Sequence, residues 1–114
     1  MKSLWKGKKM ALRVNQDNFE EKVLQSDKPV LLDFYSDTCI PCKRMAGPLG
    51  DVEDEYEDKI HVYKVNVNYD GALAEQYHVM SAPTLVYLVN GEEKSRLVGA
   101  AGKEDIVKLF ENNL

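Results

Sequence analysis

Short apolar runs alternate along this chain with stretches of helical periodicity. The clearest run, Val30–Tyr35, is interrupted only by Asp33. A nearly continuous apolar run is typical of a strand covered on both faces of a sheet. Asn90-Gly91 is a strong hairpin signal and predicts antiparallel pairing of the strands on either side of it. The strands expected from β-branched and aromatic content are residues 11–14, 30–35, 60–67, 84–89 and 94–98.

Helical spacing is clearest over residues 39–56. Met45, Leu49, Val52 and Tyr56 follow one another at intervals of four, three and four, so a helix would place them on one face. A second helix is predicted from residues 15–17, which offer N-cap side chains, to about residue 25. Two more helices are expected at residues 72–77 and 103–114.

The order of these elements predicts the fold class. It reads βαβαβαββα, and strands that alternate with helices imply parallel crossover connections. We therefore expect an α/β domain over residues 11–114, with a mixed five-stranded central sheet flanked by four helices. Residues 1–10 carry four lysines and no acidic residue, and we expect them to form a flexible basic tail.

Composition narrows the class of protein. The 114 residues suffice for one domain, and the chain is 44% hydrophobic and 30% charged, as in ordinary soluble proteins. The net charge of −4 becomes more negative once the basic tail is set aside, so nucleic-acid binding is not expected. No apolar run has the length of a membrane span or a signal peptide. We expect a cytoplasmic monomer that makes no membrane contact.

Cys39-Ile40-Pro41-Cys42 carries the chemistry of the chain and contains its only two cysteines. The pair lies between a predicted strand and a predicted helix, so Cys39 would meet the free amides of a helix N-terminus. Such a position lowers a thiol pKa and favours the nucleophilic thiolate. Cys42 is placed to resolve a mixed disulfide formed on Cys39. Pro41 fits the first helical turn, where no amide hydrogen is needed, and would tune the redox potential.

The cysteine pair could also be a stabilising disulfide or part of a structural zinc site. A purely stabilising disulfide would close a very small loop and so remove little entropy from the unfolded chain. A structural zinc site needs four ligands, but there is no second cysteine pair, and His61 and His78 stand alone in the sequence. We therefore expect redox chemistry, with neither a metal nor another cofactor.

Several short motifs along the chain have a characteristic joint spacing. They are Asp33-Phe34-Tyr35, Cys39-Ile40-Pro41-Cys42-Lys43, Lys64 and Asn66, Ser81-Ala82-Pro83-Thr84, Asn90-Gly91 and Val98-Gly99-Ala100. By the joint spacing of these motifs, and not by any one of them, the chain resembles the thioredoxin family over residues 10–114.

The chain also departs from the family pattern near the cysteines. Ile40 replaces a glycine, and Thr38 and Tyr35 stand where the family often has tryptophan. The proline that usually follows the second cysteine by five residues is shifted by one, so that Gly47 takes its place before Pro48. These changes leave the dithiol intact and bear on substrate choice, redox potential and recognition by a reductase.

The resemblance implies roles for residues around the dithiol. A carboxylate in an apolar strand needs a partner or a raised pKa, unless it faces solvent at an edge. The family places such an aspartate beneath the second cysteine, which makes Asp33 the proton acceptor for Cys42 and Lys64 its electrostatic partner. It also implies a cis Ala82–Pro83 bond. The expected substrate rim consists of Tyr35, Ile40, Met80, Ala82, Pro83 and Gly99.

The function implied is reduction of protein disulfides by a reversible Cys39–Cys42 cycle. Neither GxGxxG nor GxxxxGK[ST] occurs in the chain, so a separate flavin- or iron–sulfur-dependent thioredoxin reductase is expected to supply electrons. Disulfide-containing client proteins would receive them. Two alternatives remain at this point: a disulfide oxidase or isomerase, and a thioredoxin-fold binding module in which the cysteines are incidental.

Overall fold

The fold is taken from a computed structural model, which describes residues 12–114. The expected basic tail, residues 1–10, and the first residue of the expected first strand lie outside this range. The elements are β1 (Leu12–Arg13), η1 (Glu20–Leu24), β2 (Val30–Tyr35), α1 (Ile40–Glu55), β3 (His61–Asn66), α2 (Gly71–Gln76), β4 (Thr84–Val89), β5 (Glu92–Val98), α3 (Lys103–Lys108) and η2 (Glu111–Asn113).

The strands form one mixed sheet in the order β1-β3-β2-β4-β5. β1, β3 and β2 run parallel, while β4 pairs antiparallel with β2 and β5 antiparallel with β4. The β4–β5 hairpin turns at Asn90 and Gly91, whose φ angles are +53° and +79°, as a tight two-residue turn requires. β2 lies at the centre, and its carboxyl end leads directly to the cysteines.

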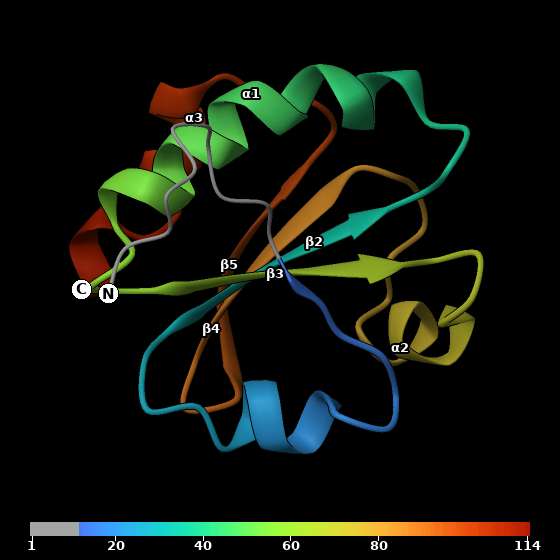
Figure 1. Ribbon diagram of the computed structural model, residues 1–114, viewed down its shortest axis with the longest axis horizontal. Helices are drawn as coiled ribbons and strands as arrows, with labels where there is room; N and C mark the ends of the chain where they lie inside the picture. The colour runs from blue at the N-terminus through green and yellow to red at the C-terminus, as the bar shows by residue number, and fades with distance from the viewer. Residues whose placement is uncertain (1–11) are drawn as a thin grey trace, which may run out of the picture.

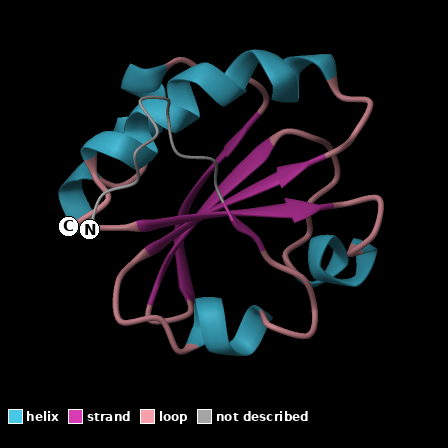
Figure 2. Ribbon diagram, in the orientation of Figure 1, coloured by secondary structure: helices cyan, strands magenta, loops and turns pink. Residues whose placement is uncertain are grey.

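Helices cover both faces of the sheet, as the apolar run in β2 predicted (Figures 1 and 2). α1 and α3 lie on one face, where Met45, Leu49 and Val52 pack with Ile106 and Phe110. η1 and α2 lie on the other face and bury apolar side chains from β2, β3 and β4. Side chains alternate along a strand, so Asp33, two residues after Leu31, faces the α1 layer.

The first helix differs from the prediction. An α-helix was expected from about residue 15 to residue 25, but only Glu20–Leu24 is helical, and Gln25 donates its amide hydrogen to the Glu20 carbonyl five residues back. Asn15 and Asn18 bond to each other's backbone amides and hold the preceding residues in a turn. The expected core residues Phe19 and Val23 are nevertheless buried.

The last helix is shorter than expected. Residues 103–114 were predicted as one helix, but α3 ends at Lys108 and a separate 3-10 turn, η2, follows. Two side chains on the sheet bond to backbone carbonyls in this region: Ser95 Oγ donates to the Leu109 carbonyl at 2.7 Å and Tyr87 OH to the Asn113 carbonyl at 3.2 Å. These tertiary contacts, together with burial of Phe110, override the local helical pattern.

No helix within residues 12–114 is both long enough and apolar enough to cross a membrane.

Candidate active site at Cys39 and Cys42

Cys39 caps the N-terminus of α1. Its backbone is extended (φ −83°, ψ 108°), and its sulfur accepts a hydrogen bond from the Cys42 amide at 3.1 Å. The helix begins at Ile40, and Pro41 occupies its first turn, where the missing amide hydrogen costs nothing. The sulfur of Cys39 therefore lies where amide hydrogens and the helix dipole stabilise negative charge.

The two cysteines form a disulfide. Their Cα atoms are 5.2 Å apart, and both residues are partly exposed. The structure therefore represents the oxidised state of the pair. The strand-to-helix junction predicted from the sequence is what brings the sulfurs together at the carboxyl edge of the parallel strands.

Asp33 lies on β2, the strand that leads to this junction, and is only 5% exposed. Its Oδ1 makes no hydrogen bond to any of the residues described. Burial raises the pKa of Asp33 from 3.8 to about 6, while the positive charge of Lys64 lowers it and offsets part of that rise. The carboxyl group can therefore take up or release a proton near neutral pH.

Lys64 and Tyr35 complete the surroundings of Asp33. Lys64 is directly opposite Asp33 in the β2–β3 register, and its ammonium group lies 4.6 Å from the centre of the Tyr35 ring. The resemblance placed Tyr35 near the substrate rim, but here its ring lines the cavity next to Asp33. This cavity, of about 290 Å³, also has Cys42 in its wall, so Asp33 and Cys42 line the same space.

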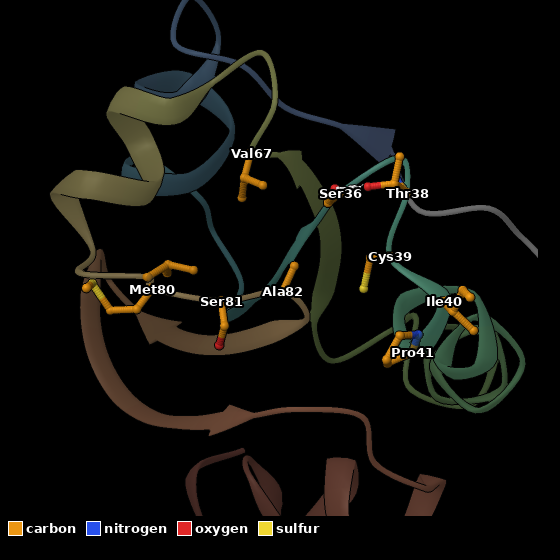
Figure 3. Close-up of a pocket in the computed structure, with 10 residues that line it drawn as sticks. Ser36, Thr38, Cys39, Ile40, Pro41, Val67, Met80, Ser81 and Ala82 are labelled. Carbon is orange, nitrogen blue, oxygen red and sulfur yellow. Dashed lines mark hydrogen bonds between the residues drawn. The ribbon is translucent and has the colours of Figure 1, made fainter.

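A second hollow opens on the Cys39 side and has a volume of about 560 Å³ (Figure 3). Ile40 and Pro41 lie on one side of Cys39 and Met80, Ser81 and Ala82 on the other. Ile40 is 60% and Met80 93% exposed, so neither side chain is simply part of the core. We call this hollow the Cys39 groove; its lining residues are Ser36, Thr38, Cys39, Ile40, Pro41, Val67, Val79, Met80, Ser81 and Ala82.

Pro83 directly follows Ala82 of the groove and is hydrogen-bonded to Gly99. The Ala82–Pro83 peptide bond is cis, as the resemblance implied, and Pro83 itself is buried. The Gly99 amide donates to the Pro83 carbonyl at 2.8 Å, with Gly99 at φ +95°, a conformation that favours glycine. Neither residue is among those that line the groove, so their predicted part in substrate binding stays a prediction.

Comparison with known proteins agrees with this geometry. The thioredoxin family model matches residues 10–112. A thioredoxin of Rickettsia bellii is 34% identical over 105 residues, covering 92% of this chain and all of that protein. Thioredoxin 1 of Nostoc is 36% identical, covering 91% of this chain and 97% of the relative. The chloroplastic M-type thioredoxin of Spinacia oleracea is 38% identical, covering 89% of this chain and 56% of the relative.

The chain belongs to the thioredoxin family. The family match and the Cys39–Cys42 pair together identify a thiol–disulfide oxidoreductase, with the role of a protein-disulfide reductase and redox carrier. Neither the oxidase or isomerase alternative nor the binding-module alternative gains support from the relatives.

Sequence reasoning missed the polar contacts that hold the loop before Cys39. Asn66 is 2% exposed and donates from Nδ2 to Asp37 Oδ1 at 2.9 Å. Asn68 Oδ1 accepts hydrogen bonds from the Asp37 amide and from Ser36 Oγ. Asn66 at the end of β3 and Asn68 just after it therefore hold the loop of residues 36–38 in place. A polar residue closing an apolar strand, such as Asn66, is the signal that could have indicated this.

The histidines take no part in the site. His61 stacks on Tyr63 with ring centres 5.5 Å apart and lies 3.4 Å from Asp27 Oδ1, while His78 follows α2. Within residues 12–114, no group of three or more histidine, cysteine, aspartate or glutamate side chains could hold a metal ion.

Proposed function

We propose that Cys39 is the attacking thiol and Cys42 the resolving thiol in the reduction of client disulfides. The Cys39 thiolate attacks one sulfur of the client disulfide, forms a mixed disulfide and releases the other client sulfur as a thiolate. The Cys42 thiolate then attacks Cys39 Sγ, which releases the second client thiolate. Two electrons pass from the dithiol to the client, and both client thiolates take up protons. The Cys42 amide aimed at Cys39 Sγ is the observation that supports this order.

Asp33 is proposed as the proton acceptor for Cys42. The Cys42 thiol must lose a proton before it can attack, and its side of the disulfide shares the 290 Å³ cavity with Asp33. With a pKa of about 6, Asp33 is mostly ionised at pH 7, yet it is basic enough to take up a proton transiently. Lys64, held over the Tyr35 ring, supports the ionised form electrostatically. Tyr35 thus acts through Lys64 in this proposal, and Pro41 tunes the potential.

The Cys39 groove is proposed as the client site. Its exposed apolar side chains, Ile40 and Met80, flank the sulfur that attacks, and the backbone at Ala82 offers a peptide edge held in place by Pro83 and Gly99. An extended client segment can pair with such an edge through backbone hydrogen bonds. Contacts of this kind depend little on client sequence, which suits a carrier with many clients.

We further propose that the protein works as a cytoplasmic monomer in electron transport and redox homeostasis. A disulfide reductase acts only where its dithiol is restored, so a separate flavin- or iron–sulfur-dependent thioredoxin reductase supplies the electrons. Both sulfurs, the groove and the Asp33 cavity come from a single chain, which supports action as a monomer.

Insulin reduction and the redox potential test this function together. The protein should accelerate the reduction of insulin disulfides by dithiothreitol, and a Cys39→Ser/Cys42→Ser variant should not. Equilibration with dithiothreitol should give a Cys39–Cys42 potential below about −260 mV, more reducing than the extracted cytosolic glutathione pool. A potential well above that pool would instead favour the oxidase.

A further inference from the structure

Residues 77–82 form the arm that carries one side of the Cys39 groove. They connect the end of α2 to the cis Pro83, and four of them, Val79, Met80, Ser81 and Ala82, line the groove. Met80, Ser81 and Ala82 lie across it from Ile40 (Figure 3). At its far end the arm is fixed, because Thr84 Oγ1 donates to the Ser81 carbonyl at 2.7 Å. The near end, at residues 77 and 78, needs a separate support.

The near end of the arm has an unfavourable backbone conformation. α2 closes with His78 at φ +54°, a left-handed position that glycine usually occupies at the end of a helix. The His78 amide bonds to the Glu75 carbonyl at 3.0 Å and the Val79 amide to the Ala74 carbonyl at 2.8 Å. A residue other than glycine in this conformation persists only where its surroundings fix it.

Arg96, on β5, contacts the near end of the arm through its side chain. Its Nη2 donates to the Tyr77 carbonyl at 2.7 Å and its Nη1 to the His78 carbonyl at 3.4 Å. These two carbonyls flank the turn into the arm and have no partner within α2. The side chain of Arg96 is only 28% exposed, so the guanidinium lies against the protein and not free in solvent.

Glu93 orients Arg96, and an irregularity in β5 makes this contact possible. Arg96 donates from Nε and Nη2 to the two carboxylate oxygens of Glu93, at 2.7 and 2.8 Å. Residues three apart in a regular strand face opposite sides of the sheet. Here the pairing shifts between Tyr87 and Leu88, with Lys94 as the extra residue. Such a bulge can re-aim a side chain, and it brings Glu93 and Arg96 to the α2 face.

We propose that Arg96, oriented by Glu93, is a positioning residue that fixes the arm of residues 77–82 for client binding. This inference rests on the proposed use of the Cys39 groove by client proteins. Arg96 touches neither cysteine, so it acts only through the backbone of the arm. Its loss should therefore affect clients that need the groove and spare small disulfides that need only the Cys39 sulfur.

The test compares two oxidants of the reduced protein. The second-order rate constant is measured with insulin, a protein disulfide, and with Ellman's reagent, a small aromatic disulfide. Arg96→Met keeps the length of the side chain and removes the guanidinium. It should slow the reaction with insulin roughly tenfold, the effect of losing one or two charge-assisted hydrogen bonds, and leave the reaction with Ellman's reagent unchanged. Glu93→Gln should give a smaller loss with the same selectivity.

Lys108→Met is the matched control, because it removes one positive charge from the exposed side of α3 without touching the arm. It should react with both oxidants at the rate of the wild-type protein. The role of Arg96 would be overturned if Arg96→Met and Glu93→Gln slowed the reactions with insulin and with Ellman's reagent equally. It would also be overturned if these variants slowed neither reaction. A wild-type protein that reduces no insulin at all would instead overturn the proposed function, and this inference with it.

Discussion

The two sulfurs of the active site open on different surroundings. Cys39 faces a groove of about 560 Å³ with exposed apolar side chains, whereas Cys42 faces a cavity of about 290 Å³ that contains a buried carboxylate and a lysine. Only two residues, Ile40 and Pro41, separate them, yet one side suits a partner protein and the other suits proton transfer. The different roles proposed for the two thiols therefore depend on the residues that the sheet and α1 place around each of them.

Exchange of each cysteine for serine should give the largest difference between the two sides. Cys39→Ser should abolish insulin reduction and form no covalent adduct, because the remaining thiol of Cys42 does not line the Cys39 groove. Cys42→Ser should still attack clients but stall as a mixed disulfide. Non-reducing gel electrophoresis and intact mass measurement distinguish the two outcomes. A stable adduct on Cys42 in the Cys39→Ser variant, with none in the converse variant, would reverse the assignment.

Asp33→Asn tests the Cys42 side alone. Without the carboxylate, the Cys42 thiol loses its proton acceptor, so resolution of the mixed disulfide should slow by about 100-fold, the lower range for a general base. Alkylation of Cys39 by iodoacetamide should change little, because its thiolate is stabilised by the helix terminus. Rapid mixing with a client followed by acid quenching measures the formation of the mixed disulfide on Cys39 and its resolution by Cys42. Unchanged resolution at pH 7 would remove Asp33 from the mechanism.

The same carboxylate should make the stability of the oxidised protein depend on pH. The folded pKa of about 6 exceeds the ordinary value of 3.8, so between these values the folded state holds a proton that the unfolded state has lost. Stability should therefore fall as the pH rises from about 4 to about 6, by up to ~3 kcal/mol, and then level off as far as Asp33 is concerned.

Urea unfolding of wild type and Asp33→Asn across this pH range measures that difference. The variant should lose this part of the pH dependence and be the more stable protein above pH 6. Asp58→Asn, at an exposed carboxylate, is the matched control and should keep the wild-type profile. Parallel profiles for wild type and Asp33→Asn would mean that burial of Asp33 carries no such cost.

Local sequence patterns correctly predicted the elements that depend on the spacing of nearby residues. The apolar face of α1 and the buried run of β2 are confirmed, and with them the junction that places Cys39 at a helix N-terminus. The resemblance added residues that no spacing could assign, among them Asp33 and Lys64. Their roles stay predictions, although the structure brings them to the same cavity.

Contacts between distant residues account for what sequence reasoning missed. Asn66 lies 29 residues from the loop that it holds at Asp37, and Arg96 lies 19 residues from Tyr77. The contact of Arg96 with Glu93 also depends on a bulge in β5 that no pattern in Glu92–Val98 indicates. For the same reason the expected helix at residues 103–114 was too long, since it ends where the sheet engages its carbonyls.

Met80→Ser tests the Cys39 side and should give the smallest effect. Met80 is 93% exposed, so its loss should leave the stability of the protein unchanged. If a client covers part of this side chain, losing that apolar contact should slow insulin reduction roughly two- to fivefold. Ellman's reagent, which needs only the sulfur of Cys39, should react as before.

Leu12→Ser is the matched control, because Leu12 is 63% exposed but lies on β1, at the edge of the sheet and outside the groove. Equal rates for Met80→Ser and Leu12→Ser with insulin would show that the groove contributes the Cys39 sulfur and its backbone edge to client binding, and that the exposed methionine adds nothing.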